Sequence, residues 1–191
     1  MSPEHTTHTP TADAAASAYP IRLAGAHDAG AVVSVEVAAA LRFRETAHAE
    51  LVHTRPGSIE DYRLAAVERR LWVALSRSVP IGFALVEVDD VDVHLEEIDV
   101  APEHGGRGVG ARLLARVCDW ARARGAPAVT LTSFDDVAWN RPFYERRGFR
   151  VLEQAELSIA LSRRMQEEAA VGLNVSRVAM RRLLSPGGEA L

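Results

Sequence analysis

Four glycines lie within six residues in the stretch GGRGVG (105–110). The stretch follows an apolar run and precedes a helix-like segment, whose first backbone N–H groups lack partners and carry partial positive charge. Glycine lets a bulky anion approach those amides closely. We therefore predict a pyrophosphate site, to which Arg107 adds a charged contact. Its residues are Gly105, Gly106, Arg107, Gly108, Val109 and Gly110.

Two common nucleotide-binding motifs do not match this stretch. No Lys-Ser or Lys-Thr pair follows it, as a P-loop requires, and the spacing of Gly106, Gly108 and Gly110 differs from that of the dinucleotide fingerprint. All 22 basic residues are arginine, which also excludes a Schiff-base lysine. A flexible turn is the alternative interpretation of a glycine cluster by itself.

Two motifs resemble those of the GNAT family of N-acetyltransferases. EEIDVAPEHGGRGVGARLL (96–114) resembles the acyl-coenzyme A motif, in which a strand ending in Val-x-Pro leads to [Gln/Arg]-x-x-Gly-x-[Gly/Ala] at a helix start. WNRPFYERRGF (139–149) is similar to the second motif, a short helix with a Tyr that closes on Gly-Phe. The resemblance spans about 19–155. Gly105 departs from the usual Gln or Arg, which removes a side-chain contact with coenzyme A.

The resemblance implies acetyl transfer from acetyl-coenzyme A, as co-substrate, to a primary amine of a small molecule by direct attack on the thioester. It implies that the strand at 93–100 is bulged and splayed from the next strand, with Ile98 and Val100 against the cofactor and the Ile98 N–H at the thioester carbonyl. Tyr144 takes the general-acid position, since a phenol of pKa about 10 can protonate a thiolate of pKa about 8.5. The alternative is a tyrosine that packs its ring and bonds its hydroxyl to the backbone.

The catalytic base has several candidates. Glu96 and Glu97 are consecutive in a strand, so their side chains should point to opposite faces and only one should reach the cleft. We predict Glu97, acting directly or through water. His94, on the face of Glu96, is an alternative because it titrates near neutral pH. Deprotonation of the amine in bulk water would need no base at all.

Charged residues around the expected cleft suggest two kinds of acceptor. Acidic residues near its mouth favour a cationic amine, whereas basic residues at 40–58 would fit a carboxylate on an amino-acid-like substrate. Asn140 either binds coenzyme A or is the N-cap of its helix. The acidic residues are Asp89, Asp90, Asp92, Glu96, Glu97, Asp135 and Asp136, and the basic ones Arg42, Arg44, His48, His53 and Arg55.

Two other functions remain open: acetylation of protein or peptide N-termini, and a non-catalytic acyl-coenzyme A sensor. The net charge of −4 argues against a nucleic-acid partner, and no apolar run approaches the roughly 20 residues of a membrane span. No metal is expected. The single Cys118, expected to be buried, fits a reducing cytoplasm.

Hydrophobic periodicity and turn residues predict the helices and strands that carry these residues. We predict one domain (19–185), preceded by an N-terminal tail (1–18) that is expected to be disordered and followed by a C-terminal tail (186–191). The domain should have an α/β fold of the GNAT type, with a mixed, mostly antiparallel sheet of about six or seven strands and about four or five helices. Expected strands are 19–25, 71–75, 81–88, 93–100, 128–134, 149–154 and 175–184. Expected helices are 29–45, 58–70, 109–124, 139–148 and 157–172. The last helix could pack on the sheet edge or form a homodimer contact.

Overall fold

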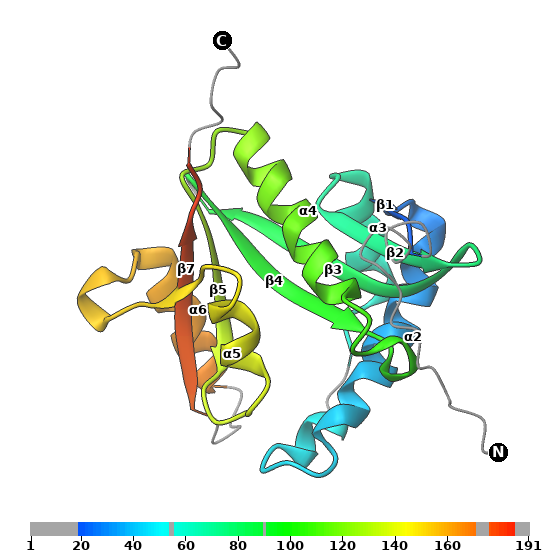
Figure 1. Cartoon of the computed structure of the whole chain (residues 1–191), viewed down its shortest axis with the longest axis horizontal. Coiled ribbons are helices and arrows are strands. Elements are labelled where there is room, and N and C mark those ends of the chain that lie inside the picture. The colour runs from blue at the N-terminus through cyan, green and yellow to red at the C-terminus, as the bar shows by residue number, and fades with distance from the viewer. Residues whose placement is uncertain (1–18, 54–55, 90, 171–175, 186–191) are drawn as a thin grey trace, which may run out of the picture.

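A seven-stranded sheet runs through the described part of the chain, residues 19–53, 56–89, 91–170 and 176–185 of this computed structural model (Figure 1). Five α-helices of that part cover its two faces, which confirms the expected fold class. The two predicted tails, 1–18 and 186–191, lie outside the described residues.

The elements follow the predicted order, with shorter ends. The strands are β1 (Ile21–Leu23), β2 (Leu71–Ser76), β3 (Val79–Asp89), β4 (Asp92–Val100), β5 (Ala128–Phe134), β6 (Arg150–Val151) and β7 (Arg177–Leu183). The helices are α2 (Ala29–Ala40), α3 (Ile59–Val67), α4 (Val109–Ala123), α5 (Asn140–Glu145) and α6 (Ile159–Ala170). The strand expected at 149–154 pairs over two residues only. A short 3-10 helix, Ala49–His53, lies between the first two expected helices, where no regular element was predicted.

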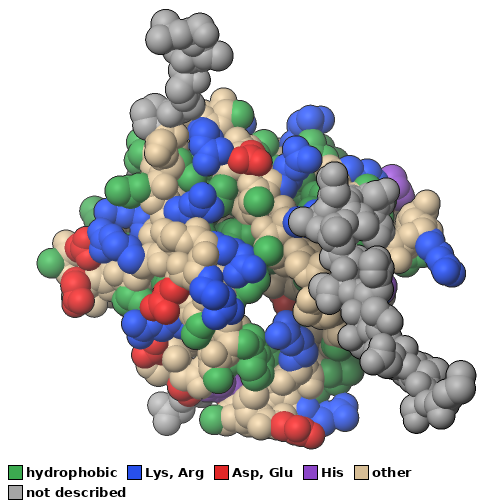
Figure 2. Space-filling view, in the orientation of Figure 1, with side chains coloured by type: hydrophobic (Ala, Val, Ile, Leu, Met, Phe, Trp, Pro, Cys, Tyr) green, Lys and Arg blue, Asp and Glu red, His purple; other side chains and the backbone are tan. Residues whose placement is uncertain are grey.

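The sheet opens between its two central strands. Its order is β1-β2-β3-β4-β5-β7-β6, and every pair is antiparallel except β4 and β5, which pair in parallel only from Val93–Leu95 to Val129–Leu131. Beyond these residues the two strands diverge, as Figure 1 shows. The face of the molecule drawn in Figure 2 has a hollow between α5 and the start of α4.

A β-bulge in β4 coincides with this divergence. Leu85 of β3 pairs with Glu97 and Val86 pairs with Leu95, so Glu96 is an extra residue without an opposite partner. An extra residue bends the strand and ends regular pairing. The bulge and the splay that the family resemblance implies are therefore confirmed.

The backbone of β4 beyond the bulge points two N–H groups toward the gap. The Ala101 N–H donates to the Ile81 carbonyl at 2.9 Å, so it points toward β3. Peptide groups alternate sides along a strand, hence the N–H groups of Ile98 and Val100 point away from β3. They face the space that β5 has left.

Each face of the sheet has its own apolar core. On one face, α4 buries Leu113, Val117 and Cys118, and α5 lies beside it. On the other, α2 and α3 cover Phe83 and neighbouring side chains. The helix α6 packs on this second face through Leu161, which is 2% exposed. The described residues contain no helix long and apolar enough to cross a membrane.

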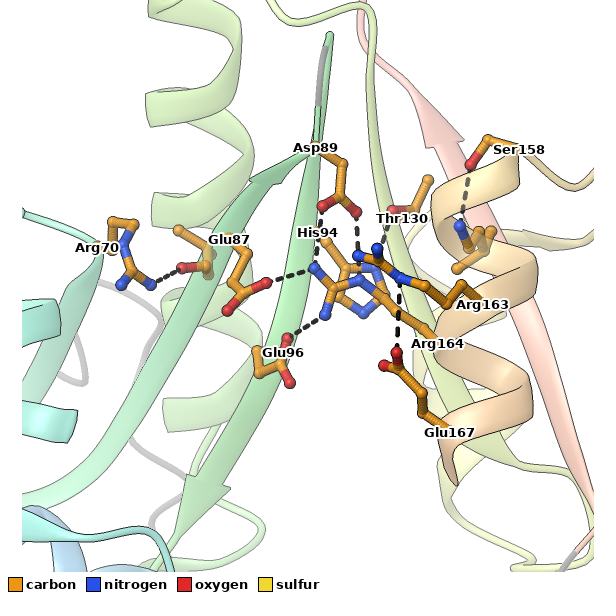
Figure 3. Close-up of polar contacts among 12 residues, drawn as sticks. Arg70, Glu87, Asp89, His94, Glu96, Thr130, Ser158, Arg163, Arg164 and Glu167 are labelled. Carbon is orange, nitrogen blue, oxygen red and sulfur yellow. Dashed lines mark hydrogen bonds and ion pairs between the residues drawn. The ribbon is translucent and has the colours of Figure 1, made fainter. Parts of the chain in front are cut away.

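An ion cluster ties α6 to the β3–β4 hairpin next to the bulge (Figure 3). The Arg164 guanidinium bonds to Asp89 at 2.9 and 3.2 Å, to Glu96 at 2.8 Å and to Glu87. Its side chain is only 13% exposed, so solvent screens these contacts weakly. Removing the cation would leave three neighbouring carboxylates to repel one another.

We predict that Arg164→Met lowers the free energy of unfolding by roughly 1–3 kcal/mol, because partly buried carboxylates lose their counter-charge. The matched control is Arg163→Met, since Arg163 is 71% exposed and meets Glu167 alone at 3.5 Å. The Arg163–Glu167 pair should contribute less than about 0.5 kcal/mol to the free energy of unfolding. Urea unfolding followed by circular dichroism measures both variants, and equal losses would show that the Arg164 cluster does not anchor α6.

Candidate active site

Two cavities of about 350 Å³ each meet at the gap between β4 and β5. The first, which we name the glycine-loop cavity, is lined by Arg42, Ile98, Val100, His104, Gly105, Gly106, Gly108, Val109, Gly110, Ala111, Trp139, Asn140, Phe143, Tyr144, Arg146 and Arg147. The second, the carboxylate cavity, is lined by Glu36, Ala39, Ala40, Arg42, Phe43, Leu51, Leu95, Glu96, Glu97, Ile98, Asp99, Thr132, Ser133, Phe134, Trp139, Asn140, Tyr144 and Arg177. Both include Arg42, Ile98, Trp139, Asn140 and Tyr144.

The glycine loop winds tightly into the first turn of α4. Gly106 and Gly108 have φ angles of +71° and +77°, a left-handed conformation that side chains resist, so these two positions favour glycine. The amides at the start of α4 lie at the cavity wall with Val109 and Gly110. Arg107 lies elsewhere: it does not line the cavity, and its guanidinium donates to the Tyr19 hydroxyl at 2.8 Å.

The glycine-loop cavity has positive side chains and no carboxylate among its described lining residues. Its cations are Arg42, Arg146 and Arg147, two of which come from the turn after α5. A helix N-terminus combined with guanidinium groups fits a polyphosphate such as the diphosphate of coenzyme A. Our sequence reasoning missed Arg146 and Arg147, although the second motif contains both.

Tyr144 lies where the two cavities meet. Its ring packs edge-on against Phe143 and Phe149, with centroids 5.1 and 5.9 Å away. Among the described residues its hydroxyl has no hydrogen-bond partner, so the purely structural alternative, a hydroxyl bonded to backbone, does not hold. Burial raises the pKa of Tyr144 above its usual value, with a smaller contribution from Asp99. The phenol therefore keeps its proton in the neutral pH range.

A carboxyl cluster forms one wall of the carboxylate cavity. The Tyr62 hydroxyl of α3 lies 2.7 Å from a Glu36 oxygen of α2 and 3.1 Å from a Glu97 oxygen of β4. Asp99 faces the same side, two residues beyond Glu97. Burial, followed by the neighbouring negative charges, raises the pKa of both Glu97 and Asp99. The cluster therefore holds protons at a pH where exposed carboxyls have lost them.

The hydroxyl of Tyr62 has two carboxyl acceptors within reach. A hydroxyl has one hydrogen and can donate to one acceptor at a time. Glu36 also accepts the Gly57 N–H, at 3.0 and 3.2 Å, and it is the closer acceptor for Tyr62. Glu97 is the second acceptor within reach of this hydroxyl, at 3.1 Å, and its pKa is raised by burial and then by the charges of Asp99 and Glu36.

The bulge overturns the expectation that Glu96 and Glu97 point to opposite faces, because it breaks the two-residue alternation and both side chains line the carboxylate cavity. Glu96 is engaged by Arg164. His94 lines neither cavity: it is 2% exposed, its Nδ1 lies 3.0 Å from the Thr130 hydroxyl, and burial lowers its pKa to about 4. Figure 3 shows His94 beside Arg164.

Several charged residues expected around the cleft form ion pairs outside it. Asp135 pairs with Arg141 at 3.0 Å, Asp136 with His48 at 2.7 Å, and Asp89 with Arg164; none of these carboxylates lines the carboxylate cavity. Asp90 and Arg55 lie outside the described residues. The cavity instead takes its acids from Glu36, Glu96, Glu97 and Asp99, of which we had missed Glu36 and Asp99.

Asn140 lines both cavities as the first residue of α5. Trp139 holds the N-cap position of that helix, so the alternative role of Asn140 as the N-cap is wrong. The described residues contain no group of three or more His, Cys, Asp or Glu side chains arranged to hold a metal ion.

Comparisons with known proteins agree with this geometry. Glucosamine 6-phosphate N-acetyltransferase of Trypanosoma brucei brucei is 36% identical over 61 residues, which are 32% of this chain and 40% of that protein. PaiA N-acetyltransferase of Thermoplasma acidophilum, solved with coenzyme A, has a TM-score of 0.67 at 15% identity, covering 86% of this chain and 98% of its own. The ribosomal-protein-S18-alanine N-acetyltransferase of Escherichia coli has a TM-score of 0.64 at 20% identity, covering 91% and 98%.

The chain thus spans two fifths of the curated relative it matches, while the solved structures share its fold over most of their length. A family model described as the acetyltransferase (GNAT) family matches residues 35–149, which include the glycine loop, the bulged strand and Tyr144. Because this match covers more than half of the chain, the protein belongs to the acetyltransferase (GNAT) family.

Proposed function

We propose that this protein transfers the acetyl group of acetyl-coenzyme A to a primary amine of a small cationic molecule, by direct attack on the thioester. One observation carries the proposal: a cation-lined cavity over a helix N-terminus and a carboxylate-lined cavity meet at Ile98 and Tyr144. The first fits an anionic acyl donor and the second a protonated amine.

Donor binding uses the glycine loop and the open strand. The α4 amides and the loop Gly105–Gly110 receive the diphosphate, which needs no side chain at Gly105. The pantetheine arm enters the gap between β4 and β5, where the N–H groups of Ile98 and Val100 face it. In this placement the Ile98 N–H donates to the thioester oxygen and stabilises the negative charge of the tetrahedral intermediate.

The proton transfers have candidates on the two sides of the thioester. The amine nitrogen attacks the carbonyl carbon, the C–S bond breaks, and the thiolate takes the proton of Tyr144, which solvent then replaces. On the other side, the ionised member of the carboxyl pair Glu97 and Asp99 takes one proton from the ammonium group before the attack, and solvent takes the second nitrogen proton as the amide forms. Because their pKa values are raised, their ionised forms are stronger bases than ordinary carboxylates.

The similar proteins include enzymes for both types of acceptor that the sequence left open. The trypanosomal relative is an N-acetyltransferase of glucosamine 6-phosphate, a small amine, whereas the E. coli structure is an enzyme for a protein alanine. The carboxylate cavity supports the small-molecule proposal, since about 350 Å³ lies within the range of pockets for small ligands.

We predict that the protein releases free thiol from acetyl-coenzyme A in the presence of cationic amines, and that Tyr144→Phe lowers kcat by about 100-fold. The affinity for acetyl-coenzyme A should stay within about twofold, because the ring still packs. Tyr19→Phe is the control, since Tyr19 contacts the glycine loop through Arg107 but lines neither cavity.

To test this prediction, the free thiol released from acetyl-coenzyme A is detected with a chromogenic reagent. The acceptors compared are amino acids, polyamines, aminosugars, arylamines and peptides. Undiminished turnover by Tyr144→Phe would remove Tyr144 from the mechanism. Binding of acetyl-coenzyme A without thiol release from any amine or peptide would favour the sensor, and release with peptides alone would favour the N-terminal acetyltransferase.

We predict that Asp99→Asn raises the acceptor KM about tenfold and stabilises the fold at about pH 8. A carboxyl whose pKa is raised on folding binds protons in the native state, so stability falls as pH rises from the ordinary pKa near 4 toward the raised one. Replacing Asp99 removes one of these carboxyls, so the free energy of unfolding at about pH 8 should rise by roughly 1 kcal/mol.

Chemical unfolding at about pH 5 and about pH 8 tests the second effect, and the wild type should lose more stability between them than Asp99→Asn. Asp119→Asn is the control, because Asp119 is 66% exposed on α4 and contacts Arg122. If the wild type and Asp99→Asn lose equal stability between the two pH values, ionisation of the carboxyl cluster does not destabilise the fold.

A further inference from the structure

Three arginines without carboxylate partners surround a second hollow beside the glycine-loop cavity. This hollow, which we name the arginine hollow, is lined by Ala111, Leu114, Ala115, Arg146, Arg147, Gly148 and Arg182. It shares Ala111, Arg146 and Arg147 with the glycine-loop cavity, so the two are continuous. On this face, Figure 2 shows basic side chains gathered where α5 and β7 lie in Figure 1.

The contacts of these arginines hold them in place without neutralising them. Arg147 donates to the Phe143 carbonyl at 2.6 Å and stacks its guanidinium 3.8 Å from the centre of the Phe143 ring. Arg182 reaches Cys118 Sγ at 3.6 Å and lies against the backbone of Gly148. The side chain of Arg146 makes no hydrogen bond or ion pair with another described residue; only its backbone N–H is bonded, to the Pro142 carbonyl at 3.3 Å.

The contrast with other arginines of the chain is clear. Arg22, Arg141, Arg150 and Arg164 each meet at least one carboxylate within 3.0 Å. No Asp or Glu lines the arginine hollow in the described part of the chain. Three like charges brought together without a counter-ion repel one another, and an anion that fits the hollow relieves this repulsion.

The position of the hollow along α4 indicates which anion fits. The glycine loop ends at Gly110, and the hollow begins at Ala111 and extends to Ala115, a distance of about 6 Å along the helix axis. Coenzyme A carries its diphosphate and a separate phosphate on one ribose, at the 5′ and 3′ positions. A diphosphate at the glycine loop therefore places the 3′-phosphate within reach of the hollow.

The charge of that group also matches. A phosphate monoester carries about −1.5 to −2 at neutral pH and offers three acceptor oxygens. Guanidinium forks bind such oxygens in pairs. Because the guanidinium of Arg147 is already oriented by Phe143, less conformational entropy is lost when it binds.

We propose that Arg146, Arg147 and Arg182 bind the 3′-phosphate of coenzyme A, and that the protein thereby selects coenzyme A over its 3′-dephospho form. This inference rests on the proposed function, since it assumes that the diphosphate occupies the glycine loop. These arginines would supply side-chain contacts with coenzyme A in place of the contact that is missing at Gly105, where the family usually has Gln or Arg.

Isothermal titration of the full chain with coenzyme A and with 3′-dephospho-coenzyme A tests the proposal without any acceptor. The wild type should bind the dephospho form at least about tenfold more weakly, a difference of about 1.4 kcal/mol. Arg182→Gln should weaken coenzyme A binding several-fold and leave binding of the dephospho form unchanged, because Arg182 lines only the arginine hollow. Arg146 also lines the glycine-loop cavity, so Arg146→Gln should weaken binding of both ligands, and that of coenzyme A by the larger factor. Arg116→Gln, an exposed arginine of α4 outside the hollow, should change neither.

Equal affinity of the wild type for both ligands would overturn the 3′-phosphate site while the donor binding of the proposed function stands. Variants that weaken both ligands equally would overturn it as well, and would assign these arginines to the diphosphate. Binding of neither ligand by folded wild-type protein would contradict the proposed function itself. Circular dichroism of each variant separates loss of binding from loss of folding.

Discussion

The site depends on one extra residue in β4. Glu96 has no opposite partner in β3, so the strand bends and its pairing with β5 ends after Leu95. The same irregularity opens the gap, leaves the Ile98 N–H facing it, and turns two consecutive glutamates toward one cavity. Arg164 then holds Glu96 from α6, so the bulge is supported by a helix that lies between β6 and β7 in the sequence.

The sheet separates two opposite electrostatic environments. Cations and helix amides line the glycine-loop cavity, whereas four carboxyls line the other cavity. The cavities share Arg42, Ile98, Trp139, Asn140 and Tyr144, so the proposed anionic donor and cationic acceptor would each be favoured on its own side and meet at these shared residues. Burial first, and the neighbouring charges of Asp99 and Glu36 second, raise the pKa of Glu97, so ionising this side of the site costs free energy.

Local patterns in the sequence predicted the fold well, and contacts between distant elements account for what they missed. Spacing of Leu113, Val117 and Ala121 predicted α4, and the glycine loop lies at its start as expected. Asp99 could have been found, since it lies two residues from Glu97 on one strand face. Glu36 could not, because only packing of α2 and α3 on β4 brings it to Tyr62. Arg107 departs from expectation because Tyr19, 88 residues earlier, binds its guanidinium.

The basic residues of the donor cavity have a chemical consequence of their own. Arg42, Arg146 and Arg147 line the space in which an activated thioester would lie. A guanidinium stays protonated and has no free lone pair for attack on a carbonyl, whereas a lysine amine loses its proton more readily and is a nucleophile. No lysine occurs among the 191 residues. The chain therefore offers its donor no side-chain amine, and it is resistant to self-acylation at lysine both in the cavity and over its whole surface.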